Sequence, residues 1–165
     1  MNVTLLQNPS SISEDLTYTF FIEGISDILF QELMPYKKGS HTIAPLEKLK
    51  KEYSFSSLDS LRASKYIVML KDTLLNEKSI KTLEELRISL QSNPNNDIKE
   101  ESLPTFYKRS LNCSFSLKKL QELIFSIDLE STPLENKHLS KALFRAFPKE
   151  QRKLFDEVVI QDKKK

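Results

Sequence analysis

The chain has 165 residues, of which 39% are hydrophobic and 29% are charged, and its formal net charge is +2. This balance is typical of a globular chain that buries its own core, and it argues against an intrinsically disordered protein. No apolar run reaches the roughly 18 residues that a membrane-spanning helix needs, and the first residues lack the basic leader of a signal peptide. We therefore expect a cytoplasmic, or otherwise intracellular, protein without a membrane partner.

Glycine is scarce, and this favours helices over strands. Gly24 and Gly39 are the only two glycines in the sequence, whereas strand-rich folds need many tight turns in which glycine adopts a positive φ. Helical bundles need far fewer such turns. The sequence therefore predicts an all-α fold, a helical bundle of about seven to eight helices.

The first predicted helix runs from about residue 11 to Met34. Ser11 is followed three residues later by Glu14, which is the capping-box pattern that opens many helices. The apolar residues that follow keep helical spacing over more than half of the circumference: Leu16, Phe20, Phe21, Ile25, Ile28, Leu29 and Leu33. A face that wide belongs either to a core helix or to a helix that docks on a partner. In the second case Phe21 and Ile28 would contact the partner.

Three further helices are predicted in the middle of the chain. Pro45 is well placed at the first helical position of a short helix that ends at Tyr53. Apolar residues at intervals of three or four predict a longer helix from about residue 57 to residue 76, and Ser79 begins the next one, which ends near Leu90. The last two would form an antiparallel helical hairpin.

A polar stretch, residues 93–102, shows no apolar periodicity and is predicted to be a linker or a surface loop. It separates an N-terminal helical lobe, 1–92, from a C-terminal helical lobe, 103–165, although a single compact domain with a long loop is also allowed. The charge changes sign here, because residues 1–102 carry 12 basic and 15 acidic side chains whereas residues 103–165 carry 13 and 8. The basic C-terminal lobe is the place to look for an anionic partner.

The C-terminal lobe is predicted to hold a short segment, 104–111, and then three helices. The first spans residues 116–128. The second opens with the sequence TPLE at 132–135, with threonine at the N-cap, proline at the first helical position and glutamate at the third. It ends near Phe147, because Pro148 disfavours helical geometry in the residue before it. The third follows Pro148.

The residues that carry most enzyme chemistry are few. His41, His138 and Cys113 are the only histidines and the only cysteine, which is too few for a zinc site with four such ligands, and nothing has the HExxH spacing. Two isolated glycines also exclude the glycine-rich loops that hold nucleotide phosphates. We therefore expect no catalytic residue, no metal, no cofactor and no enzymatic activity.

Basic residues near the C-terminus suggest where an anionic partner would bind. Six of them would form one ridge if the two helices around Pro148 fold together: Lys137, Lys141, Arg145, Lys149, Arg152 and Lys153. Such a ridge suits the phosphate backbone of a nucleic acid, with binding that weakens as salt rises. Two other interpretations stay open, namely an ordinary solvated helix face and a helix-turn-helix whose second helix begins at Asn136.

These observations favour a non-catalytic helical subunit of a larger assembly, which contacts a nucleic-acid backbone through the basic ridge. The alternative is a protein–protein adaptor, chaperone or inhibitor that docks through the apolar helix 16–34. No motif in the chain identifies a known family.

Overall fold

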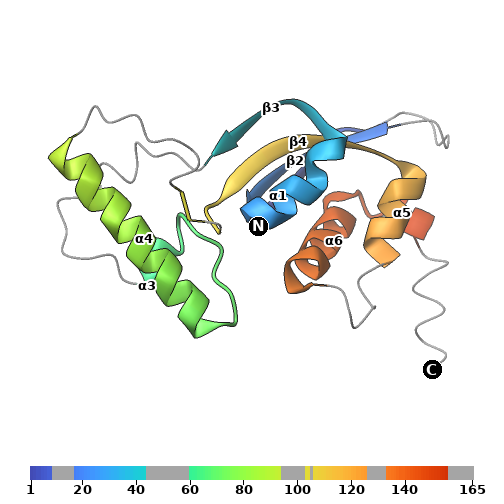
Figure 1. The fold of residues 1–165 in the computed structure, drawn as a ribbon. Helices are drawn as coiled ribbons and strands as arrows, with labels where there is room; N and C mark the ends of the chain where they lie inside the picture. The colour runs from blue at the N-terminus through green and yellow to red at the C-terminus, as the bar shows by residue number, and fades with distance from the viewer. Residues whose placement is uncertain (9–16, 44–59, 94–102, 105, 126–132, 156–165) are drawn as a thin grey trace. The chain divides into compact units, whose positions relative to one another are not determined.

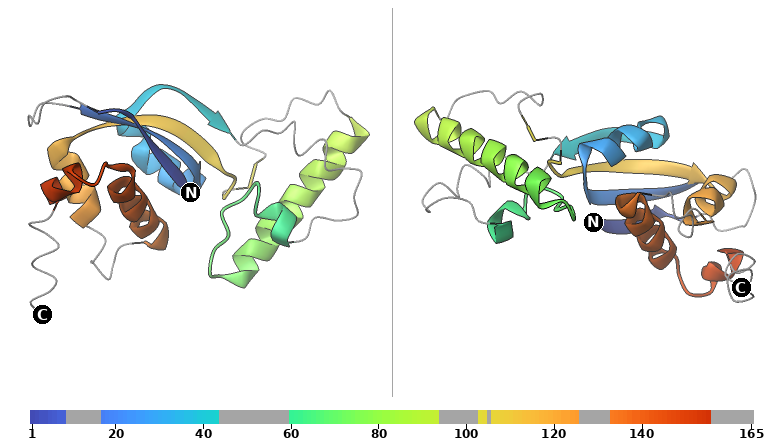
Figure 2. Two further views of the ribbon diagram at one scale, coloured as in Figure 1. Left: turned by 180° about the vertical axis from the view of Figure 1, so that it is seen from behind. Right: turned by 60° about the horizontal axis from the view of Figure 1, so that its bottom comes forward.

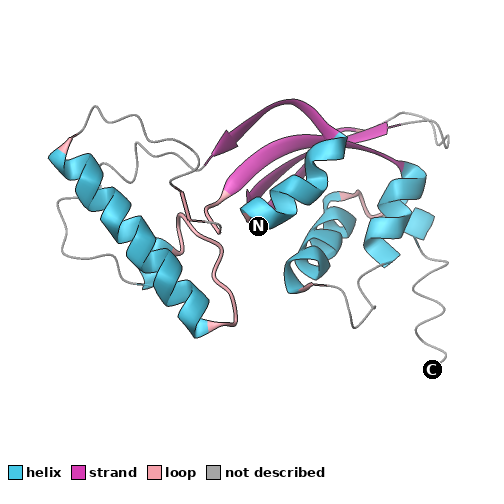
Figure 3. Ribbon diagram, in the orientation of Figure 1, coloured by secondary structure: helices cyan, strands magenta, loops and turns pink. Residues whose placement is uncertain are grey.

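The structure is a computed structural model that describes residues 1–8, 17–43, 60–93, 103–104, 106–125 and 133–155 (Figure 1). These residues form both helices and strands (Figure 3). A four-stranded sheet has the strand order β1-β2-β4-β3. Its strands are β1 (Asn2–Gln7), β2 (Thr17–Ile25), β3 (Lys37–Ile43) and β4 (Arg109–Ser116). The prediction of an all-α bundle is therefore wrong.

The scarcity of glycine did not indicate an all-α fold, because helices follow two of these strands. A helix leads from β2 towards β3, and another helix follows β4, so these connections do not use the two-residue hairpin turns that require glycine. The two glycines lie within strands instead. Gly24 in β2 has φ 71° and Gly39 in β3 has φ 78°, backbone conformations that residues with a side chain rarely adopt.

The chain divides into two compact units. Unit 1 comprises Met1–Glu23, Leu33–Ser40 and Leu111–Lys165, and unit 2 comprises Gly24–Glu32 and His41–Ser110. The lobe boundary expected at 93–102 stays a prediction, because residues 94–102 lie outside the described ones, as do the predicted cap at Ser11 and the predicted helix from Pro45 to Tyr53. No helix among the described residues is both long and apolar enough to cross a membrane.

Strand β2 occupies residues 17–25, within the segment 11–34 for which a helix was predicted, so the prediction of one continuous helix is wrong. β2 pairs with β1 in antiparallel register, with Thr4 opposite Phe21 and Asn2 opposite Glu23. Tyr18, Phe20 and Ile22 are fully buried, which is the period-two pattern of a strand with one covered face. The same residues also fit helical spacing, and their aromatic and β-branched side chains favour the strand.

Among the described residues of the predicted helix 16–34, helix α1 (Asp27–Leu33) is the α-helical part. Its start is set by Ser26, whose hydroxyl accepts a hydrogen bond from the Leu29 amide at 3.2 Å and whose carbonyl accepts one from Phe30 at 2.9 Å. A 3-10 helix, η1 (Met34–Tyr36), follows at Pro35 and ends where Lys37 adopts an extended conformation.

Strand β4 was also missed. Its residues alternate between buried and half-buried positions, and the buried ones are Arg109, Leu111, Cys113 and Phe115. The half-buried positions hold serine and asparagine, which have little preference for strands. One of them, Ser114, forms a hydrogen bond of 2.9 Å with Thr19 of β2 through the two hydroxyls.

Unit 1 contains the C-terminal helices. α5 (Leu117–Phe125) and α6 (Leu134–Ala146) lie side by side, and α6 also contacts β1 (Figure 2). Both helices were predicted, and their inward residues Leu120, Leu139 and Leu143 are buried as expected. A 3-10 helix, η5 (Gln151–Phe155), follows α6. The core is a group of contacting aromatic rings contributed by Tyr18, Phe20, Phe115, Phe147 and Phe155.

Unit 2 has a separate core around helix α4 (Thr73–Ser92) and the single-turn helix α3 (Ser60–Ala63). Its buried apolar residues are Ala63, Tyr66, Ile67, Leu83, Leu90 and Tyr107. Ile67 and Tyr107 also form an isolated antiparallel bridge.

The boundary predicted between two helices near residues 76–79 is wrong, because α4 is continuous through it. Asp72 caps the helix, since its carboxylate accepts hydrogen bonds from the amides of Leu74 (2.9 Å) and Leu75 (3.2 Å). The Asn76 side chain bonds to both the amide and the carbonyl of Leu70, each at 2.8 Å. These polar side chains fix the start of α4 earlier than the apolar spacing indicated.

Candidate functional site

The predicted basic ridge lies at the C-terminal end of the described chain. Lys137, Lys141 and Arg145 are on α6, Lys149 follows it, and the remaining two, Arg152 and Lys153, are in η5. Lys141, Arg145, Lys149 and Lys153 are exposed, whereas Lys137 is half-buried. Their role as a binding surface stays a prediction.

Arg152 differs from its neighbours, because its guanidinium is used inside the chain. Its Nε donates to the carbonyl of Phe147 at 3.0 Å and its Nη2 donates to the carbonyl of Arg145 at 2.8 Å. The guanidinium carbon also lies 5.6 Å from the centroid of the Phe144 ring. Arg152 therefore closes the turn after α6 and satisfies carbonyl groups at the end of that helix.

The two residues predicted to bind a partner, Phe21 and Ile28, are not on one helix. Phe21 is on β2 and is half-buried, whereas Ile28 is on α1 and is 51% exposed. A docking helix over residues 16–34 does not form, so the apolar face that suggested it is divided between a strand and a helix.

The structure brings together a group of side chains that sequence reasoning missed, in unit 1. This group, the Tyr36 cluster, consists of Tyr36 from η1, Phe115 from β4, and Lys119 and Glu122 from α5. The Tyr36 and Phe115 rings have centroids 5.1 Å apart, and the Lys119 ammonium lies 5.5 Å from the Tyr36 centroid. Lys119 Nζ also donates to Glu122 Oε2 at 3.1 Å.

Local structure holds Lys119 in this position. Ser116 follows Phe115 at the end of β4, and its hydroxyl accepts a hydrogen bond from the Lys119 amide at 3.2 Å. This bond begins α5 and satisfies one of the amides that a helix leaves unpaired in its first turn. Lys119 and Glu122 are three residues apart on α5, so both side chains lie on the same face.

The ionisation of Lys119 decides what the cluster can do. Hydrogen bonds to Glu122 and to Tyr36 raise the pKa of Lys119, and they outweigh partial burial, which acts in the opposite direction. Lys119 is therefore a stable cation near neutral pH and is unsuited to act as a general base. The cluster offers an aromatic ring and a fixed positive charge, which together suit a planar ligand with an anionic group.

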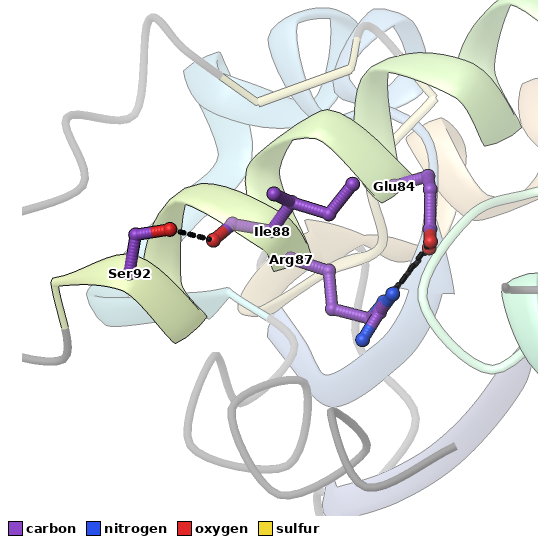
Figure 4. A network of polar contacts seen from close by, with 4 residues as sticks. All are labelled: Glu84, Arg87, Ile88 and Ser92. Carbon is purple, nitrogen blue, oxygen red and sulfur yellow. Dashed lines mark hydrogen bonds and ion pairs between the residues drawn. The ribbon is translucent and has the colours of Figure 1, made fainter. Parts of the chain in front are cut away.

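Two buried arginines of unit 2 are each paired with a carboxylate. Arg87 on α4 donates to both oxygens of Glu84, at 2.8 Å from Nε and 2.6 Å from Nη2 (Figure 4). Near the end of the same helix, the Ser92 hydroxyl donates to the carbonyl of Ile88 at 3.1 Å. Arg109 Nε lies 2.7 Å from Asp27 Oδ1, and its guanidinium lies 4.9 Å from the Phe30 centroid. Both guanidinium groups thus have a structural role.

Comparison with known proteins decides the family. No family model matches the sequence. The chain is 33% identical over 157 residues to the flavin-dependent thymidylate synthase of Campylobacter jejuni strain RM1221, and the match covers 93% of this chain and 76% of that protein. The chain belongs to the flavin-dependent thymidylate synthase family. The family member from Wolinella succinogenes is 35% identical over 150 residues, 88% of this chain and 74% of that protein.

A solved structure from the flavin-dependent thymidylate synthase family has the same fold. It is the crystal structure of the Helicobacter pylori enzyme complexed with FAD and dUMP, which matches with a TM-score of 0.70 and 31% identity over 88% of this chain and 74% of that chain. The intracellular location expected from the sequence agrees with membership of this family.

Membership of the flavin-dependent thymidylate synthase family overturns the functional predictions. A non-catalytic helical subunit that binds a nucleic-acid backbone is wrong, and so is the expectation that the protein is not an enzyme. Nucleophiles, metal ligands and glycine-rich loops mark other classes of enzyme, so their scarcity in this sequence was no argument against an enzyme. In an enzyme that depends on a flavin, the cofactor carries the oxidation–reduction chemistry.

Proposed function

We propose that the protein is an enzyme that acts on dUMP, as a flavin-dependent thymidylate synthase. The observation that carries this proposal is the match to the H. pylori structure with FAD and dUMP, at 31% identity over 88% of the chain. The matches to the C. jejuni and W. succinogenes proteins support it, because each extends over most of this chain.

The Tyr36 cluster fits the chemistry of dUMP. This ligand combines a planar pyrimidine with one phosphate group, and the cluster combines the Tyr36 ring with the Lys119 ammonium. A lysine binds phosphate as a point charge, and an aromatic ring packs against a planar base. We assign Lys119 to the phosphate and Tyr36 to the base, so that the two side chains orient the nucleotide and carry no proton in the reaction.

The described residues do not fit the pyrophosphate of FAD in the same way. Gly24 and Gly39 lie singly in two strands, and neither belongs to a glycine-rich loop. The guanidinium groups of Arg87 and Arg109 are paired with carboxylates, and that of Arg152 is bonded to carbonyls. When bound, FAD supplies oxidation–reduction chemistry; we assign none of the described residues to it.

The test measures binding and turnover separately. Purified protein is mixed with FAD, and the flavin that stays with it through gel filtration is measured by its visible absorbance. Binding of dUMP is measured by calorimetry, and thymidylate is measured from labelled dUMP with a one-carbon donor and a reductant. We expect Lys119→Gln to weaken dUMP binding about fivefold or more, while Lys153→Gln, an exposed cation of the same unit, leaves it nearly unchanged. Failure to form thymidylate at any dUMP and FAD concentration would refute the proposal.

A further inference from the structure

The most informative feature of the Tyr36 cluster is that its cation already has an anionic partner. We propose that Glu122 competes with the phosphate of the substrate for Lys119 and thereby sets the affinity for dUMP. This inference rests on the proposed function, because it takes dUMP as the ligand. It assigns Glu122 as a specificity-determining residue that acts through Lys119.

The geometry of Lys119 limits how many partners it has. An ammonium carries three N–H donors. Glu122 accepts one of them at 3.1 Å, and the ammonium also lies 5.5 Å from the centroid of the Tyr36 ring. While Glu122 holds one donor and balances the charge of the ammonium, a phosphate must share Lys119 with the carboxylate or displace it.

The carboxylate of Glu122 is placed so that it can be displaced. Its side chain is 52% exposed and that of Lys119 is 32% exposed, so water reaches both partners of the pair. Exposed ion pairs contribute little to stability because solvent screens them and both side chains lose freedom. Glu122 therefore leaves Lys119 at a small cost, and the phosphate then meets a cation already positioned beside the Tyr36 ring.

The small free energy of an exposed ion pair determines how much the affinity for dUMP should change. The full range for an exposed pair corresponds to a factor of up to about fivefold in a binding constant. We expect Glu122→Gln to tighten dUMP binding by about two- to fivefold at low salt, and the gain to shrink as salt rises. Deoxyuridine, which has the same base and no phosphate, gains nothing from the substitution.

The experiment uses calorimetry of the full chain with dUMP and with deoxyuridine, each at low and near-physiological salt. Glu150→Gln is the matched control, because it removes the same charge from an exposed position after α6 in the same unit. Circular dichroism of each variant verifies that the fold is intact. Tighter dUMP binding by Glu122→Gln alone, with deoxyuridine unchanged, supports the inference.

Equal dUMP affinities for Glu122→Gln and Glu150→Gln would overturn the inference, because net charge alone would then explain the change. An equal gain for deoxyuridine would also overturn it, since the effect would not involve the phosphate. These outcomes are distinct from failure of the proposed function. Tighter dUMP binding without any thymidylate formation supports the role of Glu122 and refutes the enzymatic proposal, whereas thymidylate formation with no change in affinity does the opposite.

Discussion

Replacing Phe147 by alanine tests the core of unit 1 directly. Phe147 is 1% exposed, and its ring meets Tyr18, Phe20 and Phe155 with centroid distances of 5.4, 5.5 and 5.0 Å. Burial of a whole phenylalanine side chain and the cavity left on its removal give a loss of about 3–5 kcal/mol in the free energy of unfolding. Phe147→Leu keeps most of the apolar volume and loses the ring contacts, so about 1–2 kcal/mol is expected.

The assay is unfolding by urea, followed by circular dichroism in the aromatic region, which reports on the packing of these rings. Phe144→Ala on α6 is the control, because its side chain is half-buried and its ring meets Phe155 with a centroid distance of 6.0 Å. A loss below about 1 kcal/mol for Phe147→Ala, or a loss no larger than that of Phe144→Ala, would contradict the packing of the end of α6 on β2.

Three further predictions concern buried or constrained groups. Glu84→Gln is expected to lower the free energy of unfolding by about 1–3 kcal/mol, because Arg87 is 6% exposed and loses its ionised partner; urea unfolding of the exposed Glu85→Gln should show almost no change. Burial raises the pKa of Cys113 to about 12 from 9.0, so a thiol reagent should label it only after unfolding. Because this folded pKa is raised, the stability that it contributes is complete below pH 9 and falls above it by at most about 1.4 kcal/mol per pH unit; Cys113→Ala should reduce that slope. Gly39→Ala should cost about 1–2 kcal/mol although the site has room for a methyl group, because φ is +78°; Gly39→Asn should cost less in the same thermal melts.

The helices of unit 1 could be predicted because their signals are local. Pro133 at the start of α6 and the apolar residues Leu139 and Leu143 one turn apart are neighbours in the sequence. Strand β4 could not be predicted in this way. It begins with Arg109, whose burial depends on Asp27 from a distant segment, and its alternate positions hold small polar residues.

Strand β2 shows a different limit. Phe20, Phe21 and Ile25 satisfy helical spacing, while Tyr18, Phe20 and Ile22 satisfy the alternation of a strand. The same residues fit both patterns, and the choice between them depends on β1 and β4, the strands that pair with β2 in the sheet. The periodicity of one segment carries no information about a partner strand elsewhere in the chain.

The cations show why the candidate site could not be found by counting charges. The predicted basic ridge includes both Arg152 and Lys141, yet Arg152 is bound to two carbonyls and Lys141 is exposed on α6. Lys119 is not part of the basic ridge. It was singled out because Tyr36, from a separate segment, lies beside it. A free surface lysine loses up to about 2 kcal/mol of side-chain entropy when it is fixed on a ligand. Lys119 is already positioned beside the Tyr36 ring, so less of that entropy remains to be lost, and a restrained cation binds an anion better than a mobile one of equal charge.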